Sequence, residues 1–226
     1  METPAEPRPQ RVGQVGSLED RIDRAEQAVQ HDADDLNNLL EYGRALYLGG
    51  MQRPAEPWTQ EAVAHWNTLL RKHADEPTVL AYAGSVRFIE SREAFLPWEK
   101  GRLAKEGEAL LNRAVALAPD DLEVRWLRAV TASQLPAFFN ADAKAKADFA
   151  YLAQALKRRA EEGAGSARGN LEPAMVASVW YHHGNYLQRR GETAAARAAW
   201  TQAIDAAPQS GAAEAAAERL GELHQR

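Results

Sequence analysis

The sequence predicts an all-α protein built from consecutive helical hairpins. Hydrophobic residues make up 45% of the 226 residues and charged residues 26%, which is typical of a soluble globular domain, and the abundant alanine favours close helix packing. Glycine or alanine also recurs at matching points of successive helical segments. Because each hairpin of such an array buries its apolar face only against a neighbour, we expect a repeat solenoid with a capping helix at each end.

The composition also excludes several classes of partner. A formal net charge of -5 gives no cationic patch for nucleic acid or for an anionic membrane. The chain has no cysteine, so disulfides and thiolate chemistry are excluded, and no run approaches the roughly 18 apolar residues of a membrane span. We therefore expect a cytoplasmic protein with no nucleic-acid partner, no membrane insertion and no cofactor.

The first expected elements are an arm and a capping helix. Residues 1–16 contain three prolines in METPAEPRPQ and no apolar segment, which predicts a disordered arm. Residues 17–160 then hold the capping helix and three hairpins. The capping helix begins at Ser17, a favoured N-cap residue. Its apolar face repeats at helical spacing and comprises Leu18, Ile22, Ala25 and Val29.

Each of the next three hairpins pairs a first helix that carries a small residue with a second helix that faces it. Glycine inside a helix costs about 0.5 to 1 kcal/mol, so it is expected where two backbones must come close. The contact residues are Leu39 and Gly43 with Ala62, Trp66 and Leu69 in the first hairpin, Leu80 and Gly84 with Gly107, Leu111, Ala114 and Pro119 in the second, and Ala129 with Ala145, Phe149 and Leu152 in the third.

The chain closes with a regular hairpin and a cap. Residues 161–173, EEGAGSARGNLEP, are predicted to form a glycine-rich linker. Residues 174–209 form the most regular hairpin, and residues 210–226 form the closing helix. The key residues of these two elements are Trp180, Gly184, Ala196, Trp200, Ala203 and Pro208, followed by Ala213, Ala217 and Leu220.

This last hairpin resembles the tetratricopeptide repeat (TPR), whose pattern places tryptophan, glycine, alanine, an aromatic residue and proline over about 34 residues. The resemblance covers about residues 17–220, and the LPWEKGRLAKEG segment also resembles bacterial repeat proteins. The resemblance implies a right-handed superhelix of helical hairpins. It further implies that the first helices line a concave groove.

The groove positions that the resemblance implies are mainly aromatic or apolar and carry few charges, so an extended or helical peptide with apolar anchors would suit them. They are Leu40, Arg44, Ala81, Ser85, Trp126, Val130, Tyr181, His182 and Asn185. Arg125 and Arg128 stand in slots that are usually apolar in the repeat. They predict a local difference around Trp126.

The first three hairpins depart from the regular spacing. The glycine and alanine slots lie 12 residues apart in the last hairpin (184 to 196), but 19 (43 to 62), 23 (84 to 107) and 16 (129 to 145) apart in the others. We expect the extra residues to form enlarged inter-helix loops. Each enlarged region joins a proline to an aromatic residue. We expect these rings to cover neighbouring helices, because large exposed apolar patches are uncommon on monomers. Alternatively, the rings form a docking edge. The edge residues are Trp58, Trp98, Phe138 and Phe139.

The candidate chemical motifs favour structural roles. His182 and His183 are adjacent, so on a helix they diverge by about 100° and cannot share one ion, and no metal site is expected. The acidic pairs Asp34-Asp35 and Asp120-Asp121 precede first helices, where carboxylates cap free N–H groups. No G-x-S-x-G nucleophile motif occurs.

We therefore expect a non-enzymatic adaptor or chaperone-like scaffold that binds a protein or peptide partner. Two alternatives stay open. The chain could associate with itself as a homo-oligomer, or it could serve in an enzyme complex through groove residues such as Tyr181, His182 and Asn185.

Overall fold

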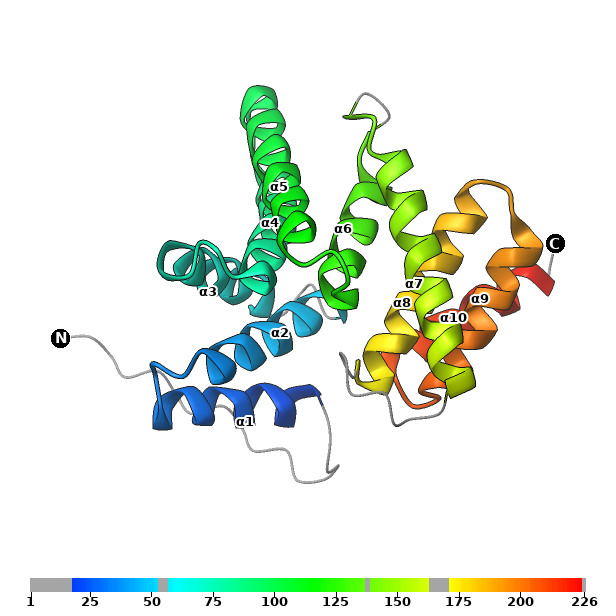
Figure 1. Cartoon of the computed structure of the whole chain (residues 1–226), viewed down its shortest axis with the longest axis horizontal. Coiled ribbons are helices and arrows are strands. Elements are labelled where there is room, and N and C mark those ends of the chain that lie inside the picture. Colours follow the sequence, from blue (N-terminus) through cyan, green and yellow to red (C-terminus); the bar gives the residue numbers. More distant parts are fainter. Residues whose placement is uncertain (1–17, 53–56, 137–138, 163–170, 225–226) are drawn as a thin grey trace. The chain divides into compact units, whose positions relative to one another are not determined.

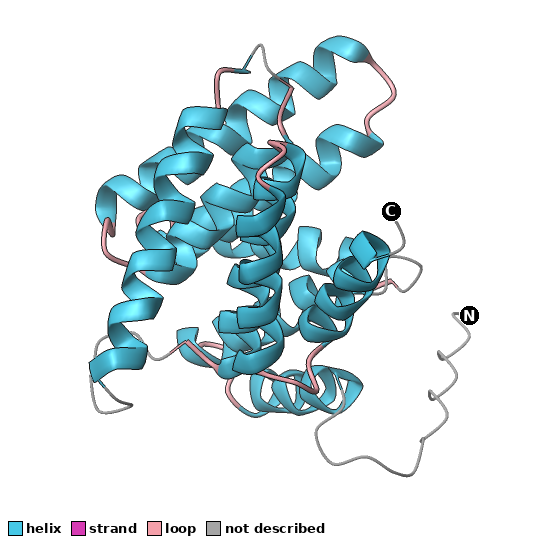
Figure 2. Cartoon of the chain, turned by 90° about the vertical axis from the view of Figure 1, so that its right-hand side faces the viewer, coloured by secondary structure: helices cyan, strands magenta, loops and turns pink. Residues whose placement is uncertain are grey.

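A computed structural model describes residues 18–52, 57–136, 139–162 and 171–224. Within these residues the chain forms ten α-helices and no strand (Figure 2). In chain order the helices are α1 (Leu18–His31), α2 (Leu36–Gln52), α3 (Trp58–Lys72), α4 (Pro77–Glu93), α5 (Pro97–Leu117), α6 (Leu122–Gln134), α7 (Asp142–Glu162), α8 (Pro173–Arg189), α9 (Thr193–Ala206) and α10 (Gly211–His224). The all-α prediction is confirmed.

Some predicted features lie outside the described residues. These are the N-terminal arm, the Ser17 cap, Phe138 and residues 163–170 of the expected linker. Both ends of that linker are helical, because α7 continues to Glu162 and α8 begins at Pro173. Contacts between Cα atoms divide the chain into two compact units, residues 1–62 and 63–226.

In the first unit, α1 packs against α2. The guanidinium of Arg21 on α1 lies 3.4 Å from the carboxylate of Glu41 on α2. The Asp35 carboxylate accepts a hydrogen bond of 2.7 Å from the backbone N–H of Asn37 and so caps the start of α2. The predicted capping role of Asp35 is confirmed.

The second unit contains three successive hairpins and a closing helix. α4 packs with α5, α6 with α7 and α8 with α9, while α10 contacts α9 and α8 (Figure 1). Neighbouring hairpins meet through α4 with α6, α5 with α6, α6 with α8 and α7 with α8. These are the helix pairs that the sequence predicts for its second, third and last hairpins.

Small residues lie where helices approach most closely. A Cβ atom added to Gly84 would lie 2.9 Å from the carbonyl oxygen of Gly107, and one added to Gly107 would lie 2.7 Å from the carbonyl oxygen of Gly84. The backbones of α4 and α5 therefore touch, and no side chain fits between them. Gly184 of α8 is packed under Trp200 of α9, with 2.5 Å left to a ring carbon for an added Cβ. The predicted glycine contacts in these two hairpins are confirmed.

Helix α4 contains an unbroken run of buried residues. All nine residues from Thr78 to Val86 are buried. The ring of Trp66 on α3 stacks on that of Tyr82, with centroids 4.3 Å apart and planes 4° apart. The Tyr82 hydroxyl donates a hydrogen bond of 2.7 Å to the carboxylate of Glu123 on α6. One buried tyrosine thereby connects α3, α4 and α6.

The predicted enlarged loop of the second hairpin is wrong. Only residues 94–96 separate α4 from α5, and the extra residues lengthen the helices instead. Leu96 is extended (φ -90°, ψ 130°) and Pro97 occupies the first helical position. Proline is favoured there because its φ angle suits a helix and its missing N–H would have had no partner. A helix therefore begins where the spacing alone indicated a loop.

We predict that Gly84→Ala lowers the free energy of unfolding by about 1 to 3 kcal/mol, because the methyl group has no space between α4 and α5. Gly101→Ala is the matched control, since an added Cβ at Gly101 meets nothing within 4 Å. Its helical position should make that variant more stable by about 0.5 to 1 kcal/mol. Urea unfolding of both variants measures the difference, and equal effects would contradict the backbone contact.

Candidate functional site

The predicted groove positions on α4 and α6 are buried. Ser85 is 3% exposed, and its hydroxyl donates to the carbonyl of Ala81 and lies 3.4 Å from the hydroxyl of Thr131 on α6. Trp126 and Val130 are 1% and 4% exposed. These three side chains fill contacts between helices, so the expectation that they form an open groove is corrected. The repeat pattern places a residue on a helix face but does not report what covers that face.

The predicted groove positions on α8 are half-buried. Tyr181 and His182 pack edge to face with ring centroids 5.2 Å apart, and His182 lies 6.0 Å from the Trp126 ring. Asn185 accepts a hydrogen bond of 3.2 Å from the indole N–H of Trp200, so it fixes the α8–α9 contact. The structure thus brings Trp126, Tyr181 and His182 together.

Arg44 lies in the other compact unit, on α2. Its guanidinium pairs with the Glu41 carboxylate of the same helix at 2.6 Å. The side chain is 21% exposed. The structure does not place Arg44 relative to the α8 positions.

The predicted docking edge divides into buried and exposed rings. Trp58 is 5% exposed and packs on Gly49, where an added Cβ would lie 2.8 Å from its ring, so this ring covers a neighbouring helix and the alternative of a docking edge is wrong for it. A tryptophan this large has room because glycine leaves space on α2. Phe139 is half-buried. Trp98, in contrast, is 72% exposed.

A second exposed ring lies beside Trp98. Phe95 is 92% exposed and stands three residues earlier, on the turn between α4 and α5. We call residues 91–100 the α4–α5 tip. The sequence predicted an edge residue at Trp98 but not at Phe95, although both aromatic residues lie in the run FLPW. Two large aromatic rings on one short turn are unusual for an exposed surface.

The α4–α5 tip is held rigidly. The Ser91 hydroxyl donates a hydrogen bond of 2.8 Å to the carbonyl of Lys100 across the turn, and the Lys100 ammonium lies 3.4 Å from the carbonyl of Arg92. The backbone N–H groups of Glu99 and Lys100 both bond the carbonyl of Leu96 at 3.0 Å. These bonds fix the backbone that carries the two rings.

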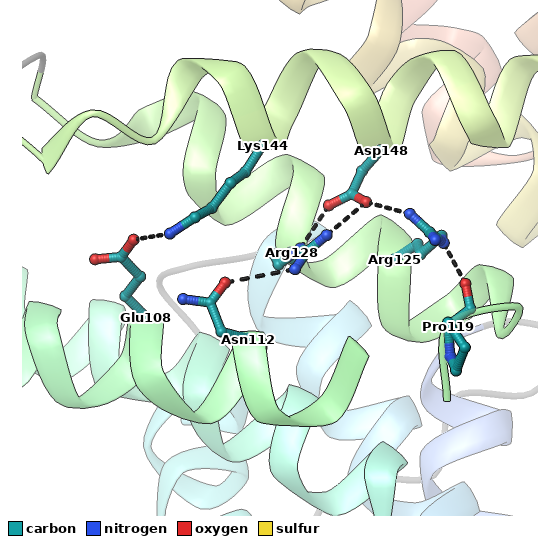
Figure 3. A network of polar contacts seen from close by, with 7 residues as sticks. All are labelled: Glu108, Asn112, Pro119, Arg125, Arg128, Lys144 and Asp148. Atoms are coloured by element: carbon teal, nitrogen blue, oxygen red, sulfur yellow. Dashed lines mark hydrogen bonds and ion pairs between the residues drawn. The ribbon is translucent and has the colours of Figure 1, made fainter. Parts of the chain in front are cut away.

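The two unusual arginines of α6 share one buried carboxylate (Figure 3). Asp148 of α7 is fully buried, and it accepts hydrogen bonds of 2.7 Å from Arg125 and of 2.7 and 2.9 Å from Arg128. Arg125 also bonds the carbonyl of Pro119, and Arg128 reaches Asn112 of α5 at 3.4 Å. The predicted local difference around Trp126 is therefore a charged cluster that joins α5, α6 and α7.

Nearby acidic residues cap helices or hold aromatic groups. The Asp121 carboxylate accepts the backbone N–H groups of Glu123 and Val124 at the start of α6, which confirms its predicted capping role. Asp120 accepts a hydrogen bond of 2.8 Å from the Tyr151 hydroxyl. That bond raises the pKa of Tyr151 above its usual value.

The histidine pair serves packing. His183 stacks on Phe149 of α7 with centroids 5.2 Å apart and planes 9° apart, and its Nδ1 atom has no hydrogen-bond partner. In the part of the chain that the structure describes, no group of three or more histidine or acidic side chains could hold a metal ion. Over the same part, no helix is long and apolar enough to cross a membrane.

No protein-family model and no curated protein matches the chain. Among solved structures, the chain is similar to a thermophilic TPR protein of Thermus thermophilus, with 15% sequence identity, 91% of this chain and 92% of that chain covered, and a TM-score of 0.62. It is also similar to the MamA RS-1 ArsTM double mutant, with 17% identity, 84% and 85% coverage, and a TM-score of 0.39. The first similarity confirms the predicted fold, so this chain has a TPR-like helical-hairpin repeat fold.

We predict that Asp148→Asn destabilises the second unit by about 3 kcal/mol, because two largely buried arginines lose their carboxylate. Asp75→Asn is the control. It breaks the exposed pair with Arg113 and should cost less than about 1 kcal/mol.

The combination of Asp148→Leu with leucine at both arginines should recover most of the loss, since apolar residues of similar size can replace a buried ionic group. Thermal unfolding followed by circular dichroism measures all these variants. A loss no larger for Asp148→Asn than for Asp75→Asn would contradict the structural role of the cluster.

Proposed function

We propose that this chain is a non-enzymatic protein-binding scaffold that docks a partner protein on the α4–α5 tip. The observation that carries the proposal is the exposure of Phe95 and Trp98 on a rigid turn. The TPR-like fold supports a scaffold role by analogy of architecture. The tip supplies the surface that we propose for partner binding.

The kind of partner follows from the shape and chemistry of the tip. α5 has no buried residue before Leu103, so its first six residues extend beyond its packed part. A projecting turn with two aromatic rings suits an apolar pocket on a folded partner. Tryptophan is enriched among the residues that dominate binding energy at protein interfaces. The hydrogen bond between Ser91 and Lys100 holds the turn in place and leaves both rings exposed.

The half-buried α8 positions remain a second proposed contact surface. Tyr181 and His182 lie side by side there, and Arg219 of α10 interacts with the Tyr181 hydroxyl. A peptide with apolar anchors could contact this edge. Tyr181→Ala tests it separately, since this position lies on a different hairpin from the tip.

The experiment that tests the proposal begins with a photo-crosslinking amino acid at position 98 in the source cell. The crosslinked protein is then purified and titrated against the wild-type chain and against Phe95→Ala and Trp98→Ala. Each truncation should weaken binding by about 30-fold, as expected for the loss of a contact worth about 2 kcal/mol. The free energy of unfolding should stay within about 0.5 kcal/mol of wild type, because both rings are exposed.

Leu117→Ala is the matched control, since this leucine is 51% exposed at the other end of α5. It should bind like wild type. Equal binding by all four proteins would contradict docking at the tip, and a lower melting temperature for Trp98→Ala would indicate that the ring has a packing role instead.

Intrinsic fluorescence gives a second measurement. The other five tryptophans are each at most 6% exposed, so acrylamide should quench Trp98 almost selectively. Partner binding at the tip should abolish this quenching. Protection that grows with the concentration of the chain alone, together with dimers in light scattering, would instead favour self-association.

A further inference from the structure

Helices α8, α9 and α10 form a group that meets the preceding hairpins through one seam. α8 and α9 are joined by the Gly184–Trp200 contact and the Asn185–Trp200 hydrogen bond, and α10 contacts both helices. The contacts of this group with α4–α7 are made mainly by α8 with α6 and α7. We call these contacts the α8 seam.

Two histidines lie in the middle of the α8 seam. The His182 ring lies 6.0 Å from the Trp126 ring of α6, and the His183 ring stacks on Phe149 of α7. His183 Nδ1 and Trp126 Nε1 are buried without hydrogen-bond partners. A proton added to His183 Nδ1 would therefore have no acceptor, and the charge would lie between apolar rings.

Polar contacts lie around these rings. The Tyr186 hydroxyl donates a hydrogen bond of 3.1 Å to Asp142 of α7, and Arg190 pairs with the same carboxylate at 2.9 Å. Arg189 donates to the carbonyl of Ser133 at the end of α6 at 3.2 Å. These contacts are exposed or partly exposed, so water can replace them when the seam opens.

We infer that the α8 seam is a pH-sensitive joint, at which protonation of His182 and His183 releases α8–α10 from α6 and α7. Opening uncovers Trp126 and Phe149, which are each 1% exposed in the closed form. The two helical groups keep their own internal contacts, because the seam is separate from the α8–α9 and α6–α7 contacts.

The charges that face the two rings set the direction of the effect. Burial and then the nearby Arg189 lower the pKa of His182 to about 4. Burial also lowers the pKa of His183 to about 4, where Glu192 acts to raise it and Lys157 of α7 acts to lower it. Since both pKa values lie below the ordinary value of about 6.5, protons bind preferentially to the open form.

The contribution of the two neutral histidines to the stability of the closed seam is therefore fully present above about pH 6.5. It is lost as the pH falls toward 4. At pH 5 the equilibrium between open and closed forms shifts by about 30-fold for a histidine whose pKa rises from about 4 in the closed form to about 6.5 in the open form.

Distances across the seam test this inference, and the absence of cysteine makes labelling selective. Spin labels at Lys146→Cys on α7 and Thr201→Cys on α9 span the seam, and both positions are exposed. At pH 5 the label distances should lengthen and broaden relative to pH 7.5. Helicity measured by circular dichroism should stay constant.

A control pair, Lys105→Cys on α5 with Lys146→Cys, lies within α4–α7 and should not respond to pH. The double variant His182→Gln, His183→Leu should keep the short cross-seam distance at pH 5. Leucine at position 183 carries no titratable group and keeps an apolar side chain against Phe149. His31→Gln, an exposed histidine on α1, should open like the parent chain.

Three results would overturn the inference. The cross-seam distance could stay unchanged at pH 5, the double variant could open as readily as its parent, or opening could coincide with loss of helicity. The last result would mean that acid unfolds the whole chain and that the seam has no separate transition.

Discussion

The second unit depends on direct contact between the backbones of α4 and α5. Gly84 and Gly107 face each other, and each would place a Cβ atom within 3 Å of the other's carbonyl oxygen. This contact keeps α5 against α4, so α5 covers one side of the run of nine buried residues that begins at Thr78. The same principle applies in the last hairpin, where Gly184 leaves space for the Trp200 ring. Small residues thus fix helix separation, and large neighbouring side chains fill what remains.

Close packing of the first helices changes what the chain can offer to a partner. Ser85 faces Thr131, and Trp126 faces His182, so residues on the expected groove face form contacts between hairpins. The large exposed rings lie at the end of the α4–α5 hairpin instead. The helix pairing of a repeat fold therefore does not by itself decide which of its side chains are exposed.

Charged and titratable groups distinguish the contacts between hairpins. Between α6 and α7, Asp148 is fully paired with two arginines, so its charge is compensated where it is buried. Between these helices and α8, His183 meets an aromatic ring and keeps an unpartnered nitrogen. The α6–α7 contact buries a carboxylate whose charge is balanced by two arginines. The contact with α8 buries a histidine that has to stay neutral.

The sequence by itself determined the all-α class, the hairpin pairs of the second unit and the caps at Asp35 and Asp121, because these follow from spacing and local hydrogen bonding along one segment. It also marked Arg125 and Arg128 as unusual. Only the tertiary structure decided that Asp148 is their partner, that Trp126 is covered and that Phe95 is exposed. Burial and ion pairing depend on which distant segments meet, and the spacing within a single helix carries no information about that meeting.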